Sequence, residues 1–176
     1  MRFNTKDITY YNQPFDHWVL DNFLDVNDAK KLSNQFIDFD NPTEEIIHYK
    51  GWIGEKRTCN RWDRFPPLTY STFSNLLSDK FIDKLSDITG ISPLYPDIGL
   101  HGGGWHMSGK GGSLAMHLDY SIHPKMNLQR KLNLIIYLEE DYNPEWGGSL
   151  QFWSHDEKNK KPVSYTHLTL PTNDQV

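Results

Sequence analysis

The sequence has 176 residues, a formal net charge of −5, and 37% hydrophobic and 14% aromatic residues. This composition is typical of one soluble globular domain, and the acidic balance gives no electrostatic footprint for nucleic acid. The single cysteine, Cys59, excludes an internal disulfide bond, and no apolar run resembles a signal peptide core or a membrane span. We therefore expect a cytoplasmic protein that binds neither membranes nor nucleic acid.

The first ninety residues predict helices with a few strands. Residues 17–23 are typical of a short strand, and residues 46–53 of another. Asp25 is a suitable N-cap for a helix whose apolar stripe has helical spacing: Val26, Ala29, Leu32, Phe36 and Ile37. A second helical region covers residues 69–89, and Gly90 follows it as a C-terminal stop.

From Ile91 onward the pattern changes to short strands joined by turns, with no linker that would mark a domain boundary. Residues 113–120 and 131–139 alternate between apolar and polar positions, and residues 147–153 form a further candidate strand after a pair of glycines. The glycine-rich stretch 100–112 lacks the Gly-Lys-Ser/Thr run of a phosphate-binding loop. This succession of strands favours a sandwich or a jelly-roll barrel.

His117 and Asp119 are the candidate metal ligands. Side chains two apart on a strand point to the same face, so the imidazole and the carboxylate would converge on one point. One histidine and one carboxylate make up two thirds of the facial triad that binds Fe(II) in non-haem oxygenases. Taken alone, such a pair is more often an ordinary surface pair, and only its surroundings favour the metal-binding interpretation.

Those surroundings resemble a known family. The similarity covers roughly residues 14–162 and is densest in four segments, 102–106, 117–119, 130–138 and 144–150, which read Gly-Gly-Gly-Trp-His, His-Leu-Asp, Arg-Lys-Leu-Asn-Leu-Ile-Ile-Tyr-Leu and Pro-Glu-Trp-Gly-Gly-Ser-Leu. Together these resemble the iron(II)/2-oxoglutarate-dependent oxygenases of the prolyl 4-hydroxylase type. The combination is far more specific than any one of its parts.

The resemblance implies an α+β fold, with a double-stranded β-helix (jelly-roll) core and flanking N-terminal helices. It places His117 and Asp119 on the first two iron ligands, and Tyr137 on a position from which some members hydrogen-bond the cosubstrate carboxylate. The implied cofactors are Fe(II) and 2-oxoglutarate, with O2 as cosubstrate and ascorbate as a possible reductant. The implied reaction is the hydroxylation of a small molecule or of a protein side chain.

The chain departs from the family pattern towards its end. Residues 1–162 form a single oxygenase-like domain, whereas residues 163–176 do not resemble the family and look like a translated sequencing adapter. The family has a distal histidine and a later Arg or Lys that pairs with 2-oxoglutarate, but no Arg or Lys follows Pro162. We therefore expect a fragment that lacks the late barrel strands and a complete active site. His155 and His167 are weak candidates for the third ligand.

Other residues have structural interpretations. His101, His106 and His123 are better explained as structural or pocket-rim residues than as ligands, and Cys59 as a small buried residue. Residues 56–64 carry charges of both signs and form either a solvated segment or a contact for an acidic substrate. Two further classes stay open at this stage: a non-catalytic jelly-roll binding module, and a cupin-like metalloprotein that does not use 2-oxoglutarate.

Overall fold

The structure is a computed structural model, which describes residues 2–35, 53–115, 117–139, 142–153 and 162–164. It contains helices and small antiparallel sheets, which is compatible with an α+β fold. The chain divides into two compact units: Met1–Ser33 with Tyr137–Val176, and Asn34–Ile136. None of the helices in the described ranges has the length and apolar character needed to cross a bilayer.

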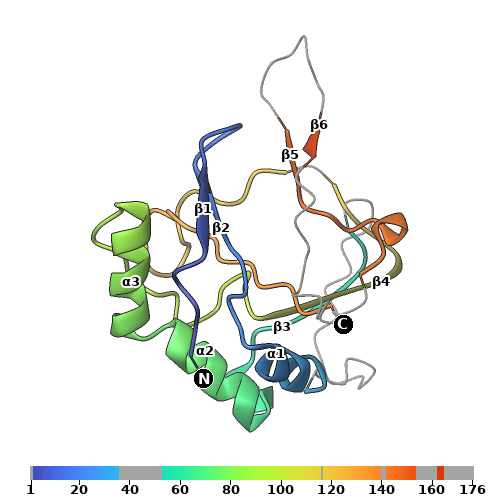
Figure 1. The fold of residues 1–176 in the computed structure, drawn as a ribbon, viewed down its shortest axis with the longest axis horizontal. Coiled ribbons are helices and arrows are strands. Elements are labelled where there is room, and N and C mark those ends of the chain that lie inside the picture. The colour runs from blue at the N-terminus through green and yellow to red at the C-terminus, as the bar shows by residue number, and fades with distance from the viewer. Residues whose placement is uncertain (1, 36–52, 116, 140–141, 154–161, 165–176) are drawn as a thin grey trace, which may run out of the picture. The chain divides into compact units, whose positions relative to one another are not determined.

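The first unit begins with a hairpin and a helix. Strand β1 (Ile8–Tyr11) pairs antiparallel with β2 (His17–Leu20), and helix α1 (Val26–Ser33) follows (Figure 1). The predicted N-cap is confirmed, because the Asn27 amide donates a hydrogen bond of 2.9 Å to the Asp25 carboxylate. In the described part of the stripe, Ala29 and Leu32 are buried and Val26 is half-buried. Its remaining members, Phe36 and Ile37, and most of the predicted strand 46–53 lie outside the described residues.

The same unit ends with a short hairpin. The 3-10 helix η2 (Pro144–Trp146) precedes β5 (Gln151–Trp153), which pairs with β6 (Pro162–Ser164). The strand predicted over 147–153 is therefore shorter than expected. Gly147 and Gly148 have φ of 70° and 81°, a left-handed conformation that is incompatible with an extended strand. The rings of Phe15 and Phe152, 4.6 Å apart, connect the two hairpins.

The second unit is built on a longer pair of antiparallel strands and two helices. Strand β3 (Ile53–Cys59) pairs antiparallel with β4 (Trp105–Leu114), as Figure 1 shows. Between them in sequence lie the 3-10 helix η1 (Trp62–Arg64), α2 (Pro67–Leu76) and α3 (Asp79–Thr89). The predicted helical region 69–89 is thus confirmed as two helices. Gly90 ends α3 in a left-handed conformation, with φ of 71°, as the sequence predicts.

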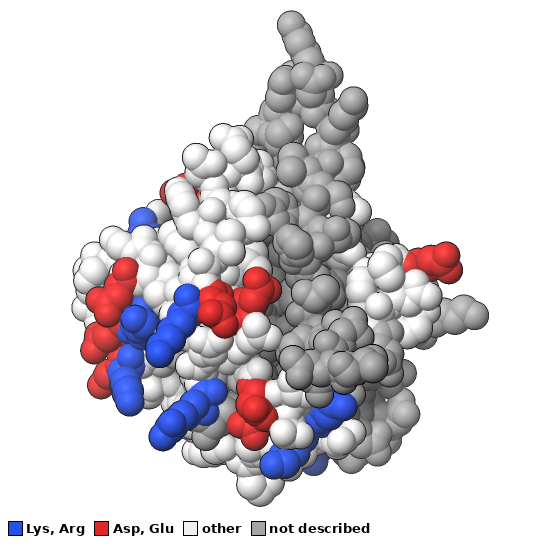
Figure 2. Space-filling model, viewed as in Figure 1, with Lys and Arg blue, Asp and Glu red and all other residues white. Residues whose placement is uncertain are grey.

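The core of the second unit lies where these elements meet. The ring of Phe73 on α2 contacts the rings of Trp62, Phe65 and Trp105, with centroids 5.0–6.4 Å apart. Cys59 is buried in this unit, as expected from the sequence. Helix α3 buries Phe81 and exposes charges of both signs, and Figure 2 shows basic and acidic side chains interspersed on the side where α3 lies.

Two predicted strands are wrong in the regions that matter most for the site. Strand β4 ends at Leu114, so residues 117–120 of the predicted strand 113–120 are not in a strand, and the described residues 131–139 form none either. Alternating polarity marks two faces, but a strand also needs a hydrogen-bonded partner. Among the described residues, the only bridge in this region joins Ile122 to Gln129. A jelly-roll core therefore stays a prediction.

Candidate metal centre

The imidazole of His117 is oriented by the backbone immediately before it. Its Nδ1 lies 2.8 Å from the Ala115 carbonyl oxygen. A carbonyl oxygen can only accept, so Nδ1 must carry a proton and donate it. In the neutral imidazole Nε2 then has the lone pair, which is the arrangement found in metal-bound histidines whose other nitrogen is held by a carbonyl.

The carboxylate of Asp119 faces that lone pair. His117 Nε2 and Asp119 Oδ1 are 3.5 Å apart, and the side chains are 40% and 47% exposed. At this distance a nitrogen lone pair and a carboxylate oxygen repel unless a second ring proton or a metal cation lies between them. With metal–ligand bonds of about 2.1 Å, two atoms bound to one ion lie roughly 3–4 Å apart. The two residues therefore fit two ligands of one ion, and both are accessible from solvent.

The other oxygen of Asp119 is held by Arg130. Arg130 Nη2 lies 3.1 Å from Asp119 Oδ2, and the Arg130 side chain is only 20% exposed. The guanidinium also lies over the ring of Tyr120, with its carbon 4.6 Å from the ring centroid, which is a cation–π contact. Sequence patterns alone assign no role to Arg130 or Tyr120. The one feature of the sequence that could have indicated a role for them is their position, since both lie in or beside the motifs that carry the family resemblance.

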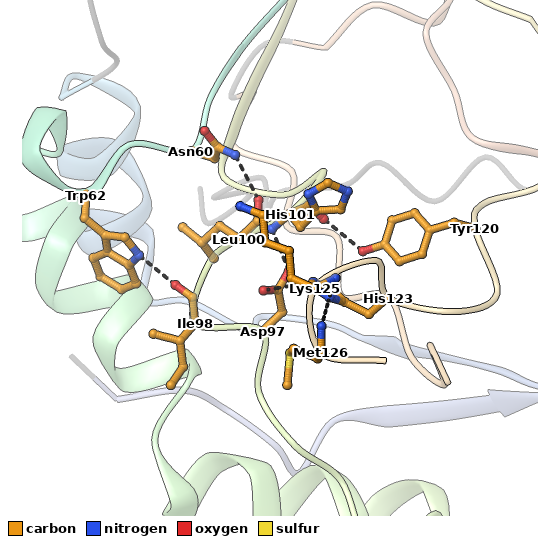
Figure 3. Close-up of polar contacts among 10 residues, drawn as sticks. All are labelled: Asn60, Trp62, Asp97, Ile98, Leu100, His101, Tyr120, His123, Lys125 and Met126. Atoms are coloured by element: carbon orange, nitrogen blue, oxygen red, sulfur yellow. Dashed lines mark hydrogen bonds and ion pairs between the residues drawn. The ribbon is translucent and has the colours of Figure 1, made fainter. Parts of the chain in front are cut away.

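Tyr120 connects this pair to the glycine-rich loop 97–104. Its hydroxyl donates a hydrogen bond of 2.9 Å to the His101 carbonyl oxygen (Figure 3). On the other side of the loop, Trp62 Nε1 donates to the Ile98 carbonyl at 2.8 Å, and Asn60 Nδ2 donates to the Leu100 carbonyl at 3.3 Å. Three side chains from distant parts of the sequence thus fix the backbone of one loop.

Asp97 and His123 complete the anchoring of the loop. Asp97 accepts a hydrogen bond of 2.6 Å from the His101 amide. His123 Nδ1 accepts from the amides of Lys125 and Met126 (Figure 3), so its proton resides on Nε2. That Nε2 lies 3.3 Å from the Asp97 carboxylate, at an angle that makes the contact electrostatic rather than a well-formed hydrogen bond. His123 is therefore structural, as its sequence context indicated.

Gly104 explains part of the glycine density in this loop. Its φ is 93°, and an added Cβ would collide with the Cys59 carbonyl oxygen and lie 2.8 Å from the Asn60 Cα. Only glycine combines this conformation with such a close approach of two backbone segments. The close approach lets β4 begin beside the end of β3.

No third protein ligand is evident among the described residues, where no group of three His, Cys, Asp or Glu side chains could hold an ion. His155 and His167 lie outside these residues. His106 is exposed on β4, and the ring of the half-buried His101 makes edge-to-face contacts with the rings of Tyr120 and His123. Neither His101 nor His106 joins His117 and Asp119 in such a group.

Tyr137 belongs to the other unit, so its contact with the cosubstrate stays a prediction. The residue is 37% exposed, yet partial burial of the phenol raises its pKa above the ordinary value of 10.0, and the neighbouring Tyr142 raises the pKa further. A raised pKa keeps the hydroxyl protonated at neutral pH. Tyr137 can therefore act as a hydrogen-bond donor to a carboxylate, which is the role that the family resemblance implies.

Comparison with known proteins points in the same direction. Residues 103–175 match the model of the 2OG-Fe(II) oxygenase superfamily, and the match includes His117, Asp119, Arg130 and Tyr137. The match supports the assignment of the chain to this superfamily and a dioxygenase-type activity. Enzymes of this superfamily in general use Fe(II) and 2-oxoglutarate. The match does not distinguish the prolyl 4-hydroxylase type from others. No curated protein and no solved structure gives a significant match to the chain.

Proposed function

We propose that this chain is an Fe(II)- and 2-oxoglutarate-dependent dioxygenase of the prolyl 4-hydroxylase type, with a double-stranded β-helix as its complete fold. Its substrate is a small molecule or a protein side chain that presents an unactivated C–H bond. One observation carries the proposal: His117 Nε2 and Asp119 Oδ1 lie 3.5 Å apart, within the superfamily match.

Each residue has a distinct task in this mechanism. His117 provides a neutral nitrogen whose direction is fixed by the Ala115 carbonyl, and Asp119 provides one negative charge. Tyr137 donates a hydrogen bond to a 2-oxoglutarate carboxylate and orients the cosubstrate. A bound Fe(II) ion would supply the means to activate dioxygen, the oxidant; one oxygen atom would enter the hydroxylated substrate and the other succinate, because 2-oxoglutarate is oxidised at the same time and loses carbon dioxide.

The ion pair between Arg130 and Asp119 also favours a second candidate. A carboxylate already paired with a guanidinium needs no metal, so the same residues could line the pocket of a non-catalytic binding module. A cupin-like metalloprotein would use the metal ligands but not 2-oxoglutarate. The three candidates differ in two measurable properties, the binding of a divalent metal and the iron-dependent binding of 2-oxoglutarate.

Equilibrium dialysis with labelled 2-oxoglutarate separates these candidates. Without oxygen, any retention of 2-oxoglutarate by the chain should depend on Fe(II), and His117→Gln and Asp119→Asn should abolish this dependence. His106→Gln is the matched control, an exposed histidine on β4. Succinate release after oxygen is admitted identifies a dioxygenase. Metal binding without iron-dependent retention of 2-oxoglutarate would favour the cupin-like protein. If the chain neither binds metal nor retains 2-oxoglutarate, the binding module is favoured.

A further inference from the structure

The two oxygens of the Asp119 carboxylate are divided between two neighbours. Oδ1 faces His117 Nε2 at 3.5 Å, and Oδ2 contacts Arg130 Nη2 at 3.1 Å. A carboxylate is free to bind a metal through one oxygen or both. Here the guanidinium occupies the second oxygen, so the carboxylate has one oxygen left for the position that it shares with His117.

The position of Arg130 is fixed from its own backbone to the end of its side chain. The Ile122–Gln129 bridge closes a short turn, and the Arg130 amide donates a hydrogen bond of 2.8 Å to the Ser121 carbonyl oxygen. These contacts bring Arg130 back beside Tyr120, whose ring lies under the guanidinium. The Tyr120 hydroxyl is in turn bonded to the His101 carbonyl. Arg130 is therefore not a freely rotating surface side chain.

An exposed arginine of the same unit offers a comparison. Arg61 also pairs with an aspartate, Asp63, at 2.7 Å, but its side chain is 54% exposed, whereas that of Arg130 is 20% exposed. The Arg61–Asp63 pair joins residues two apart in sequence. The Arg130–Asp119 pair instead spans the whole turn between them and involves a candidate ligand. The second pair is thus built into the fold.

We propose that Arg130 is a positioning residue, which holds Asp119 Oδ2 so that the carboxylate binds the metal through Oδ1 alone, and that Tyr120 acts through Arg130 by supporting its guanidinium. This inference rests on the proposed function, because it assigns a role towards the metal. Removal of a residue that hydrogen-bonds a metal ligand without binding the metal itself typically lowers metal affinity by about 10- to 100-fold.

The positive charge of Arg130 means that the sign of the change in metal affinity on substitution distinguishes a charge effect from a positioning effect. Coulomb repulsion between a guanidinium and a divalent cation weakens metal binding, so removal of the charge alone would strengthen it. Lost positioning acts in the opposite direction. Weaker binding by Arg130→Gln therefore cannot be a charge effect.

Titration of the full chain with Mn(II) measures the affinity, and the visible spectrum of bound Co(II) reports the coordination geometry. We expect Arg130→Gln to weaken Mn(II) binding by about 10- to 100-fold and to alter the Co(II) spectrum, because Oδ2 becomes free to bind. Tyr120→Leu should weaken binding less. The double variant Tyr120→Leu/Arg130→Gln should bind as Arg130→Gln does, because Tyr120 acts through Arg130. Arg61→Gln is the matched control and should change neither readout.

The outcomes are distinct. Mn(II) affinity in Arg130→Gln that equals or exceeds the wild-type value overturns the inference. So does weaker binding with an unaltered Co(II) spectrum, since Arg130 would then serve only the stability of the segment. If Arg130→Gln does not fold, Arg130→Lys decides: it keeps the charge but lacks the planar fork, and the same two changes should appear. A wild-type chain that binds no Mn(II) would contradict the proposed function itself.

Discussion

At the scale of single residues, the side chains of His117 and Asp119 meet although residues 117–120 are not in a strand: His117 Nε2 and Asp119 Oδ1 lie 3.5 Å apart. Alternation along the sequence predicts that side chains two apart lie on one side of the backbone, and this contact agrees with it. Arg130 could not be assigned a role in the same way. Its contact with Asp119 depends on the turn that closes between Ile122 and Gln129, and sequence spacing does not specify that turn.

The raised pKa of Tyr137 gives a prediction for alkaline pH. In the folded chain we expect this phenol to ionise above its ordinary value of 10.0, because burial disfavours the phenolate. Since the folded pKa lies above the unfolded one, the contribution to stability is present below about pH 10 and is lost as the pH rises through the folded pKa. The tyrosinate absorbance of the wild type minus that of Tyr137→Phe measures this ionisation. A difference titration centred at or below 10.0 would refute the prediction.

The hydroxyl of Tyr137 should also matter for the cosubstrate. We expect Tyr137→Phe to weaken anaerobic 2-oxoglutarate binding about 10- to 100-fold, since a hydrogen bond to a charged group is worth roughly 1.5–3 kcal/mol. Affinity for Mn(II) in the absence of 2-oxoglutarate should stay at the wild-type value. Tyr142→Phe serves as a neighbouring control. Unchanged 2-oxoglutarate affinity in Tyr137→Phe would mean that Tyr137 does not contact the cosubstrate and has only a structural role.

At the scale of elements, the helices were easier to predict than the strands. The Asp25 cap, the helices within 69–89 and the Gly90 stop depend on local side-chain and backbone preferences, which a sequence displays directly. Strands depend on partners that lie far away in sequence. The loop 97–104 shows the same limit, because its backbone is held by side chains such as Trp62 and Tyr120 that no local pattern connects to it.

Gly104 provides a test of how tightly this loop is built. We expect Gly104→Ala to destabilise the chain by about 2–3 kcal/mol, because the new Cβ would meet the backbone at Cys59 and Asn60. Gly90→Ala is the matched control: its φ is also positive, at 71°, but nothing lies within 4 Å of the added Cβ. That variant should cost only about 1 kcal/mol. Urea unfolding measures both, and equal losses would contradict the account of the close approach.

At the scale of the whole molecule, the resemblance found in the motifs and the superfamily match over residues 103–175 agree on a dioxygenase. The structure adds a mixture of helices and small sheets compatible with an α+β fold, and a convergent His117–Asp119 pair. The jelly-roll barrel was predicted from alternation and resemblance together. It requires strand pairings over long sequence distances, and alternation in one segment does not identify its partner.

Metal binding should stabilise the folded chain as a whole. At a free Mn(II) concentration of 100 times the dissociation constant, linkage predicts about 2.7 kcal/mol of added stability, provided that the unfolded chain does not bind. For a chain of this length, that corresponds to roughly 5–10 °C in the unfolding midpoint. Asp119→Asn should lose the shift at the same Mn(II) concentration, and a chelator should reverse it in the wild type. A shift of equal size in Asp119→Asn would place the stabilising ion elsewhere.

Nitrogen-15 NMR of the histidine side chains reports whether His117 Nε2 is a metal ligand. At pH 8 we expect His117 to carry its proton on Nδ1, opposite to His123, whose Nδ1 accepts two amide hydrogen bonds. On addition of Zn(II), a diamagnetic substitute for iron, the Nε2 resonance of His117 should shift while its Nδ1 keeps the proton. The His123 resonances should not move, and Asp119→Asn should weaken the effect. A His117 ring unaffected by saturating Zn(II) would contradict the account.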